Sequence, residues 1–182
     1  MKTLKTIQTL SKIGKIISKI IFIFCLIGGI GCFVGIISLA VIPDGFKLGG
    51  VTIHSMIEKN AEISIGTCYA AMAVGIVLCA GEAVLCKLAE KYFKNELAAG
   101  TPFTFDGAKE LMLLGICTIC IPIGTAVISG IVYGIMSSIF SGVADYSFSN
   151  TTSVGLGVMF IVMSLLCRYG AEITQNEGVS QQ

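Results

Sequence analysis

Charged residues are scarce in this chain. They make up 13% of its 182 residues, whereas hydrophobic residues make up 54%, and the mean hydropathy is +0.89. A soluble domain carries roughly a quarter charged residues, so a chain of this composition has too little polar surface to face water on all sides. The net charge is only +1, which excludes the strong overall field that draws proteins to nucleic acid. We therefore predict that most of the chain is surrounded by lipid.

Catalytic motifs are also missing. The sequence contains no nucleophile elbow, phosphate-binding loop, dinucleotide-binding glycine pattern or H-E-x-x-H zinc site. The only histidine, His54, precedes Glu58 by four residues, on a short helix that we predict from Thr52. Two ligands without a third make a weak metal site, so we interpret them as a solvated pair. We expect no enzymatic activity, cofactor or metal.

Cysteines are plentiful, but the polar loops hold none. All eight fall in or beside hydrophobic runs, where a thiol behaves as a small apolar side chain; they are Cys25, Cys32, Cys68, Cys79, Cys86, Cys117, Cys120 and Cys167. Cys117 and Cys120 have the spacing of a redox or metal pair. No second pair, histidine or charged neighbour stabilises a thiolate there, so we predict no disulfide framework and no redox site.

Four hydrophobic runs suit helices that cross the ~30 Å hydrocarbon layer of a bilayer. They cover residues 20–42, 63–86, 111–140 and 153–169. We predict an all-α polytopic membrane protein with a four-transmembrane-helix bundle over residues 20–170 and a polar, frayed tail over residues 171–182. A cleaved signal peptide is the competing interpretation of the first run, because Ser38-Leu39-Ala40 resembles a cleavage site. The first run is longer than the apolar region of a usual signal peptide, which favours a retained span.

Residues 1–19 are predicted to form a basic amphipathic helix. Four lysines fall within about 80° of the helix circumference; they are Lys5, Lys12, Lys15 and Lys19. Apolar residues occupy the opposite side, namely Leu4, Ile7, Leu10, Ile13, Ile17 and Ile20. Such a helix can rest on an anionic leaflet or extend the first span into the cytosol, and the sequence leaves both open. No aromatic residues interleave the lysines, which argues against stacking on nucleic-acid bases.

Two runs carry G-x-x-x-G steps. Gly31 and Gly35 form one step, with Gly28 one turn earlier, and Gly130 and Gly134 form the other. Such smooth stripes let another helix approach closely. We predict that the first stripe faces a helix of the same bundle, and a homo-oligomer remains an alternative.

Two residues inside the predicted spans are candidates for function. Glu82 is the only acidic residue within a span, and a charge in hydrocarbon is costly enough to mark a functional candidate. It lies about one and a half turns before Lys87, so an interfacial role beside headgroups or a lysine competes with an ion, proton or ligand role. Pro122 lacks an N–H donor and is predicted to kink the third span near Thr118.

The charged segment 87–110 separates the two hydrophobic halves, and we call it the elbow. The helix of the second span is predicted to continue to Ala99, with Glu90 and Lys94 as an i,i+4 pair and Gly100 as its C-terminal cap. Pro102 then disfavours helix at the preceding residue.

A new helix is predicted to start directly after this turn. Thr104 can cap it, and Asp106 lies in its positive first turn. Phe103 and Phe105 are apolar residues beside a charged segment, so we predict that they seat the elbow in the membrane interface.

Lysine and arginine are distributed unevenly. Ten lie on one side of the predicted spans, namely Lys2, Lys5, Lys12, Lys15, Lys19, Lys87, Lys91, Lys94, Lys109 and Arg168. Only Lys47 and Lys59 lie on the other side. Cytosolic loops carry the excess of positive residues, so we predict a multi-pass protein of the cell membrane with both termini and the elbow in the cytosol.

Two short motifs carry a resemblance. The first is Gly100-Thr101-Pro102-Phe103, followed by Asp106, Lys109, Glu110, Leu111 and Gly115. The second is Arg168-Tyr169-Gly170-Ala171-Glu172 after the last run. Over residues 20–175 the chain resembles domain-of-unknown-function family 2975, small four-span bacterial membrane proteins, although the acidic stretch expected after Glu172 is thin. The resemblance implies an integral membrane protein that accompanies a small helix-turn-helix regulator, and it implies no catalytic residues.

These patterns lead us to expect a membrane interaction or signalling component. Its elbow, with the basic N-terminal helix, would contact a small cytosolic regulator or anionic lipid headgroups, without direct contact to nucleic acid. The alternative is a small transport or immunity-type membrane protein that binds an ion, solute or peptide within the bundle, and a scaffold in a larger complex is a third. The candidate functional residues are Glu82, Pro102, Phe103 and Pro122.

Overall fold

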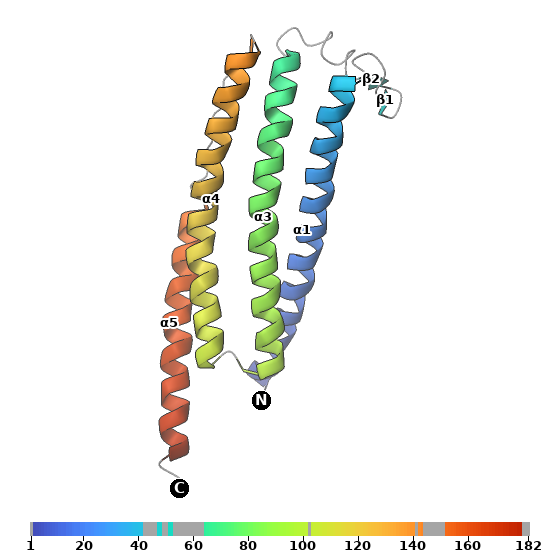
Figure 1. Cartoon of the computed structure of the whole chain (residues 1–182). Helices are drawn as coiled ribbons and strands as arrows, with labels where there is room; N and C mark the ends of the chain where they lie inside the picture. The colour runs from blue at the N-terminus through green and yellow to red at the C-terminus, as the bar shows by residue number, and fades with distance from the viewer. Residues whose placement is uncertain are drawn as a thin grey trace. The chain divides into compact units, whose positions relative to one another are not determined.

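The computed structural model describes residues 2–41, 47–48, 51–52, 64–101, 103–140, 142–143 and 152–179. These residues form helices α1 (Lys2–Val41), α3 (Ile65–Ala99), α4 (Phe105–Ile139) and α5 (Thr152–Val179), coloured in chain order in Figure 1. Strands β1 (Lys47–Leu48) and β2 (Val51–Thr52) pair antiparallel, with Leu48 opposite Val51. Thr52 therefore belongs to a strand and not to the start of the predicted helix. His54 and Glu58 lie outside the described residues.

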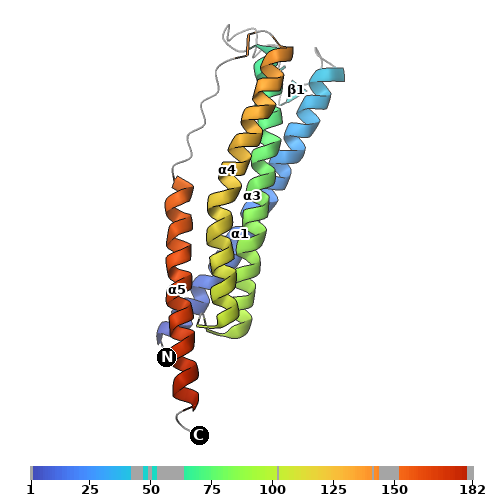
Figure 2. The same ribbon diagram turned by 60° about the vertical axis from the view of Figure 1, so that its left-hand side comes forward.

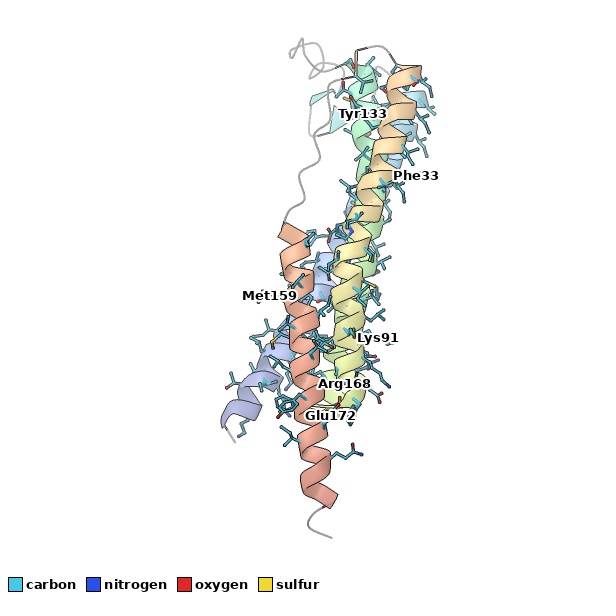
Figure 3. The ribbon with its side chains drawn as sticks, turned by 90° about the vertical axis from the view of Figure 1, so that its left-hand side faces the viewer. Phe33, Lys91, Tyr133, Met159, Arg168 and Glu172 are labelled. Atoms are coloured by element: carbon cyan, nitrogen blue, oxygen red, sulfur yellow. The ribbon has the colours of Figure 1, made fainter. Side chains whose placement is uncertain are left out.

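All four helices are long and apolar enough to cross a membrane. Large hydrophobic side chains are exposed along each of them, including Phe33 of α1 and Met159 of α5, which Figure 3 labels. Soluble monomers rarely expose apolar surface on this scale, whereas lipid requires it. The predicted all-α, four-span fold class is confirmed, and the chain is a multi-pass membrane protein.

The helices are longer than the predicted spans. The N-terminal segment and the first span form the single 40-residue helix α1, which is ~60 Å long at 1.5 Å per residue. The 35 residues of α3 measure ~52 Å, well above the ~30 Å hydrocarbon thickness. Charged residues become frequent in α3 from Lys87 onward, so we place the turns after that residue beyond the hydrocarbon layer. Helix α5 also continues through the polar tail, predicted to fray, as far as Val179.

The chain divides into two compact units. The elbow unit comprises Met1–Ile23, Glu82–Ile123 and Asn150–Gln182. The hairpin unit comprises Phe24–Gly81 and Gly124–Ser149. In α4 the division falls one residue after Pro122. The helix is assigned without a break through this buried proline, and the kink predicted near Thr118 stays a prediction.

In the elbow unit, α5 lies alongside the first half of α4, as Figures 1 and 2 both show. The two backbones approach closely because glycines meet there. A Cβ added to Gly115 would lie 2.8 Å from Ile161 Cγ1 and 2.9 Å from the carbonyl oxygen of Gly157. Nearby, the buried Ser164 hydroxyl donates a 2.8 Å hydrogen bond to the Ala108 carbonyl. The core beside this contact consists of Tyr92, Ala108, Leu111, Leu114 and Cys167.

The N-terminal part of α1 packs in this unit through small residues. Ser11 is only 4% exposed, and a Cβ on Gly14 would lie 2.7 Å from the Phe93 ring. Leu10 is 69% exposed, and Ile13 and Ile16 are exposed as well. The predicted amphipathic helix thus turns its apolar side outward and packs through its small residues, an arrangement that suits lipid contact. This favours the leaflet interpretation over a solvated extension.

In the hairpin unit, glycines of α1 meet sulfur-bearing side chains of α3. A Cβ on Gly35 would lie 2.8 Å from Met72 Sδ, and one on Gly28 would lie 3.3 Å from Cys79 Sγ. No described atom lies within 4 Å of the corresponding position on Gly31. The predicted internal neighbour of this stripe is therefore confirmed as α3, which Gly28 and Gly35 both meet.

The second glycine stripe behaves differently. Among the described residues, nothing lies within 4 Å of a Cβ placed on Gly130 or Gly134.

The other described contacts of the hairpin unit include the stacked rings of Tyr69 and Phe140, whose centroids are 5.2 Å apart. The Ser64 hydroxyl also donates a 2.7 Å hydrogen bond to the Gly142 carbonyl.

Candidate functional site

The elbow begins where α3 ends. Gly100 adopts a left-handed φ of 73°, and its N–H donates a 3.0 Å hydrogen bond to the Glu96 carbonyl. This is the C-terminal cap that glycine favours because it has no Cβ. From α1, the Gln8 side-chain amide donates to the Gly100 carbonyl at 3.3 Å. The predicted cap is confirmed, and the N-terminal helix reaches it.

The start of α4 also follows local rules. The Thr104 hydroxyl accepts the Gly107 N–H at 3.0 Å, and Asp106 lies in the first turn. The Phe103 N–H donates to the Thr101 hydroxyl at 3.2 Å. These contacts satisfy backbone donors that a helix start leaves open. Both predicted features of this helix start are confirmed, while Pro102 lies outside the described residues.

One carboxylate joins the two arms of the elbow. Glu110 of α4 accepts a 2.7 Å hydrogen bond from the Asn95 side-chain amide of α3, and its Oε1 lies 3.5 Å from Lys91 Nζ. Its other oxygen, Oε2, is buried and has no hydrogen-bond partner among the described residues. A buried oxygen without a donor carries a desolvation cost. Because no described donor occupies it, Glu110 Oε2 can accept a further hydrogen bond.

Glu90 pairs in a different way from the prediction. Lys87 Nζ lies 3.0 Å from Glu90 Oε2, so the ion pair is i,i+3 with Lys87 and the predicted pair with Lys94 is not formed. The hydrogen bond from Lys87 is the main reason that the pKa of Glu90 is lowered. The same ammonium lies 4.6 Å from the centre of the Phe22 ring of α1, a cation–π distance.

A second carboxylate, Glu96, lies half-buried between α1 and α3. Ser11 of α1 and Tyr92 of α3 are hydrogen-bonded to its side chain, although the Ser11 hydroxyl also reaches the Ile7 carbonyl at 3.0 Å. Burial raises the pKa of Glu96, and these two hydrogen bonds oppose the rise. Burial, followed by the charge of Glu96, likewise raises the pKa of Tyr92. Neutral partners thus surround this carboxylate.

Two cavities meet at Tyr92 and Glu96, which line both. The apolar cavity has a volume of about 620 Å³ and is lined by Ile7, Leu10, Ser11, Tyr92, Phe93, Glu96, Phe103, Leu111, Leu114, Phe160, Met163, Leu166 and Cys167. The polar cavity has a volume of about 580 Å³ and is lined by Tyr92, Asn95, Glu96, Ala98, Ala99, Thr101, Thr104, Asp106, Gly107, Lys109 and Glu110. Pockets of this size accommodate small molecules.

The structure brings one of the four sequence candidates to this site. Phe103 lines the apolar cavity, and its ring packs so closely on Gly170 of α5 that an added Cβ there would lie 2.5 Å from the ring. Glu82 is exposed on α3, without an ion pair or hydrogen bond to the described residues, and it lines neither cavity. Pro122 is buried in α4 and also lines neither cavity.

Sequence reasoning missed Glu96, Glu110 and Tyr92 as site residues. Tyr92 and Glu96 are four residues apart on one helix face, so their proximity was available from spacing. Their burial was not, because it depends on α1 and α5 packing against that face.

Metal or redox chemistry gains no support from the described part of the chain. There, no three histidine, cysteine, aspartate or glutamate side chains gather as a metal site requires. None of the eight cysteines, all of which lie in the described helices, forms a disulfide, and of the spaced pair Cys117 is half-buried while Cys120 is exposed.

No protein-family model, curated protein or solved structure matches the chain. The resemblance to family 2975 therefore stays a prediction, and the function must be argued from the geometry of the site.

Proposed function

We propose that the chain is a non-enzymatic interaction or signalling component of the cell membrane, and that its elbow contacts a soluble partner in the cytosol. The observation that carries this proposal is the tie between the two arms, in which Asn95 and Lys91 of α3 both hold Glu110 of α4. Caps at Gly100 and Thr104 fix the ends of the two helices. A turn held in this way presents its outward side chains in a constant arrangement.

The outward side chains are mostly charged. Lys91, Lys94, Asp106 and Lys109 are all exposed, and they mix both signs with a basic excess. Because the lysine and arginine bias favours a cytosolic elbow, the partner would be a small cytosolic regulator with acidic surface. Anionic lipid headgroups are a second partner for the same lysines.

The test is site-specific photo-crosslinking in cells that express the full-length chain. A photoreactive residue at the position of Lys94 or Lys109 should form an adduct with a soluble protein. The Lys94→Glu change should reduce the adduct formed from position 109 several-fold, because it reverses a charge beside the probe.

The matched control places the same photoreactive residue at Arg168, a basic, exposed residue of α5 outside the elbow, labelled in Figure 3. This position should give no adduct with that protein. Equal adducts at position 168 and at the elbow, or no adduct at either elbow position, would contradict the proposal.

Binding of a small molecule within the bundle is the second candidate function, and one observation favours it. The apolar cavity of about 620 Å³ lies among the helices of the elbow unit and has a carboxylate in its wall. Glu82 and Pro122, on which the sequence argument for this function relied, do not line it. The support for this function therefore comes from Glu96.

A further inference from the structure

We propose that the apolar cavity of the elbow unit binds a cationic amphiphile, a molecule with one amine or ammonium group on an apolar body, with its charge paired to Glu96. The inference rests on the second candidate function, binding within the bundle, and is independent of the partner contact at the elbow.

The walls of the cavity select an apolar body. Leu114, Phe160 and Met163 contribute aliphatic, aromatic and thioether surface from α4 and α5. The volume of about 620 Å³ lies inside the range of small-molecule sites. Burial of apolar ligand surface against such walls is favourable at roughly 25 cal/mol per Å². A small hydrated ion or a sugar would gain nothing from them.

The charge in the wall selects a cation. Glu96 is the only charged residue among the described residues that line the apolar cavity. Its hydrogen-bonding partners, Ser11 and Tyr92, are neutral, and no described lysine or arginine forms an ion pair with it. A half-buried carboxylate without a counter-ion is stabilised by a positive charge placed beside it. An anionic ligand would instead be repelled.

The neighbouring polar cavity strengthens this preference. Its lining carries Glu96, Asp106 and Glu110 against a single lysine, Lys109. The buried Oε2 of Glu110 has no donor among the described residues. With Glu110 paired to Lys91, Glu96 and Asp106 still outnumber Lys109 in this lining, which favours an ammonium group at Glu96.

Aromatic rings add a further contribution for cations. Phe93, Phe103 and Tyr92 all line the apolar cavity, and the faces of such rings attract ammonium groups within about 6 Å. A neutral acyl chain would gain from the walls alone and would use neither the rings nor the carboxylate in this way.

Several lining residues also form the outer surface of the unit. Leu10, Phe103, Met163 and Leu166 line the cavity and are nevertheless among the exposed large hydrophobic residues. The cavity is therefore open to the apolar outer surface of the unit, and a ligand held at the membrane interface can reach it.

The test uses the full-length protein in phosphatidylcholine nanodiscs and two probes of similar shape and opposite charge, tetraphenylphosphonium and tetraphenylborate. Radiolabelled tetraphenylphosphonium should bind saturably, above the background of empty nanodiscs, and radiolabelled tetraphenylborate, measured in separate samples, should not. Glu96→Gln should weaken the binding of the cation at least tenfold, because it removes the charge and keeps the shape. Glu90→Gln, a change of another α3 carboxylate that lines neither cavity, should leave binding unchanged.

A second variant keeps the test decisive if Glu96→Gln does not fold. Met163→Trp fills part of the cavity from an exposed position and should lower the amount of cation bound at saturation. Unchanged binding in either variant, or equal binding of the two probes, would overturn the proposal.

The outcomes also separate this inference from the function on which it rests. If only tetraphenylborate or a fluorescent fatty acid bound, and Met163→Trp abolished that binding, the cavity would be a ligand site that does not select cations. If no probe bound, binding within the bundle would fail as well.

Discussion

In the elbow unit polar side chains join helices in addition to close glycine contacts, whereas between α1 and α3 of the hairpin unit the described contacts are made by glycines and sulfur-bearing side chains. Ser164 links α5 to α4 and Asn95 links α3 to α4. Between α1 and α3 of the hairpin unit, Gly35 meets Met72 and Gly75 meets Cys32. Both modes are used by membrane helices, which gain little from the hydrophobic effect in lipid.

This difference bears on the proposed function. Close packing of small residues holds helices together but offers no group for recognition. Polar side chains at helix contacts are costly to bury unless they are satisfied. The elbow unit combines satisfied groups with two carboxylates that are not fully paired, Glu96 and Glu110 at Oε2, whereas the buried atom of the hairpin unit that has no partner among the described residues is the uncharged hydroxyl of Ser129. These contacts support our proposal that recognition lies in the elbow unit and that the hairpin unit gives structural support.

The largest expected effect lies at the contact of α4 with α5. Gly157→Leu should destabilise the protein by about 3 kcal/mol or prevent folding, because the new side chain would overlap Ile119 and would lie against the Gly115 carbonyl, which is backbone and cannot move aside. The measurement is unfolding by SDS titration. Gly155→Leu on the same helix, where no described atom is near, is the control and should have little effect. Equal losses of stability in the two variants would show that α4 and α5 do not approach each other closely at Gly157.

A smaller effect is expected from Ser164→Ala. The variant removes the buried hydrogen bond to the Ala108 carbonyl, and the loss of one such bond costs about 1 kcal/mol. Ser138→Ala removes an exposed hydrogen bond to the Gly134 carbonyl in the hairpin unit and should cost under about 0.5 kcal/mol. If Ser138→Ala were the more damaging change in the same SDS titration, the contrast between the units would be wrong.

Alanine substitutions at two glycines of the α1 stripe should differ from each other in stability by no more than the loss expected for Ser164→Ala. Alanine is favoured over glycine inside a helix by roughly 0.5–1 kcal/mol, so Gly31→Ala, which meets no described atom, should stabilise the protein. Gly35→Ala should lose this gain, because its Cβ would lie 2.8 Å from Met72 Sδ and the flexible Met72 side chain would have to shift. Identical midpoints for both variants would show that α1 does not contact α3 at Gly35.

The smallest expected effect is the pH dependence of stability that arises from Glu96. Burial raises the pKa of Glu96 above its ordinary value of 4.5, so the folded protein binds that proton more tightly than the unfolded chain does. The folded state should therefore lose stability as the pH rises from 4.5 through the raised pKa. Glu96 is also close to the hydroxyl groups of Ser11 and Tyr92 and to Cys167 of α5.

Thermal unfolding in a mild detergent from pH 4.5 to pH 8 measures this effect. The midpoint of the wild-type protein should fall across the range, and that of Glu96→Gln should fall less. Glu90, whose pKa is lowered by Lys87, contributes to stability with the opposite sign below its ordinary pKa, but its partner Lys87 is exposed to solvent, which keeps that contribution small. Parallel curves for the two proteins would show that Glu96 does not titrate differently on folding.

Local rules were sufficient to predict the ends of the elbow helices. The cap at Gly100 and the start at Thr104 depend only on residues within one helical turn, and both were predicted correctly. The four spans were predictable for a similar reason, since length and hydropathy are properties of a single segment.

The packing faces were not predictable in this way. An amphipathic pattern in water places isoleucines inside, but α1 buries Ser11, packs Gly14 against Phe93 and exposes Ile13, because lipid accepts the large apolar side chains and close approach requires small ones. The cavity at Glu96 depends on residues from four helices that are far apart in the sequence. No pattern within a single segment specifies that these residues come together around one cavity.

The central claim is that the elbow and both termini share one side of the membrane, opposite the segment between α4 and α5. Fusions of alkaline phosphatase and of a fluorescent protein after Asn95, Asp145 and Gln182 test it directly. The account predicts fluorescence without phosphatase activity at Asn95 and Gln182, and the reverse at Asp145. The same compartment for Asn95 and Asp145 would contradict it.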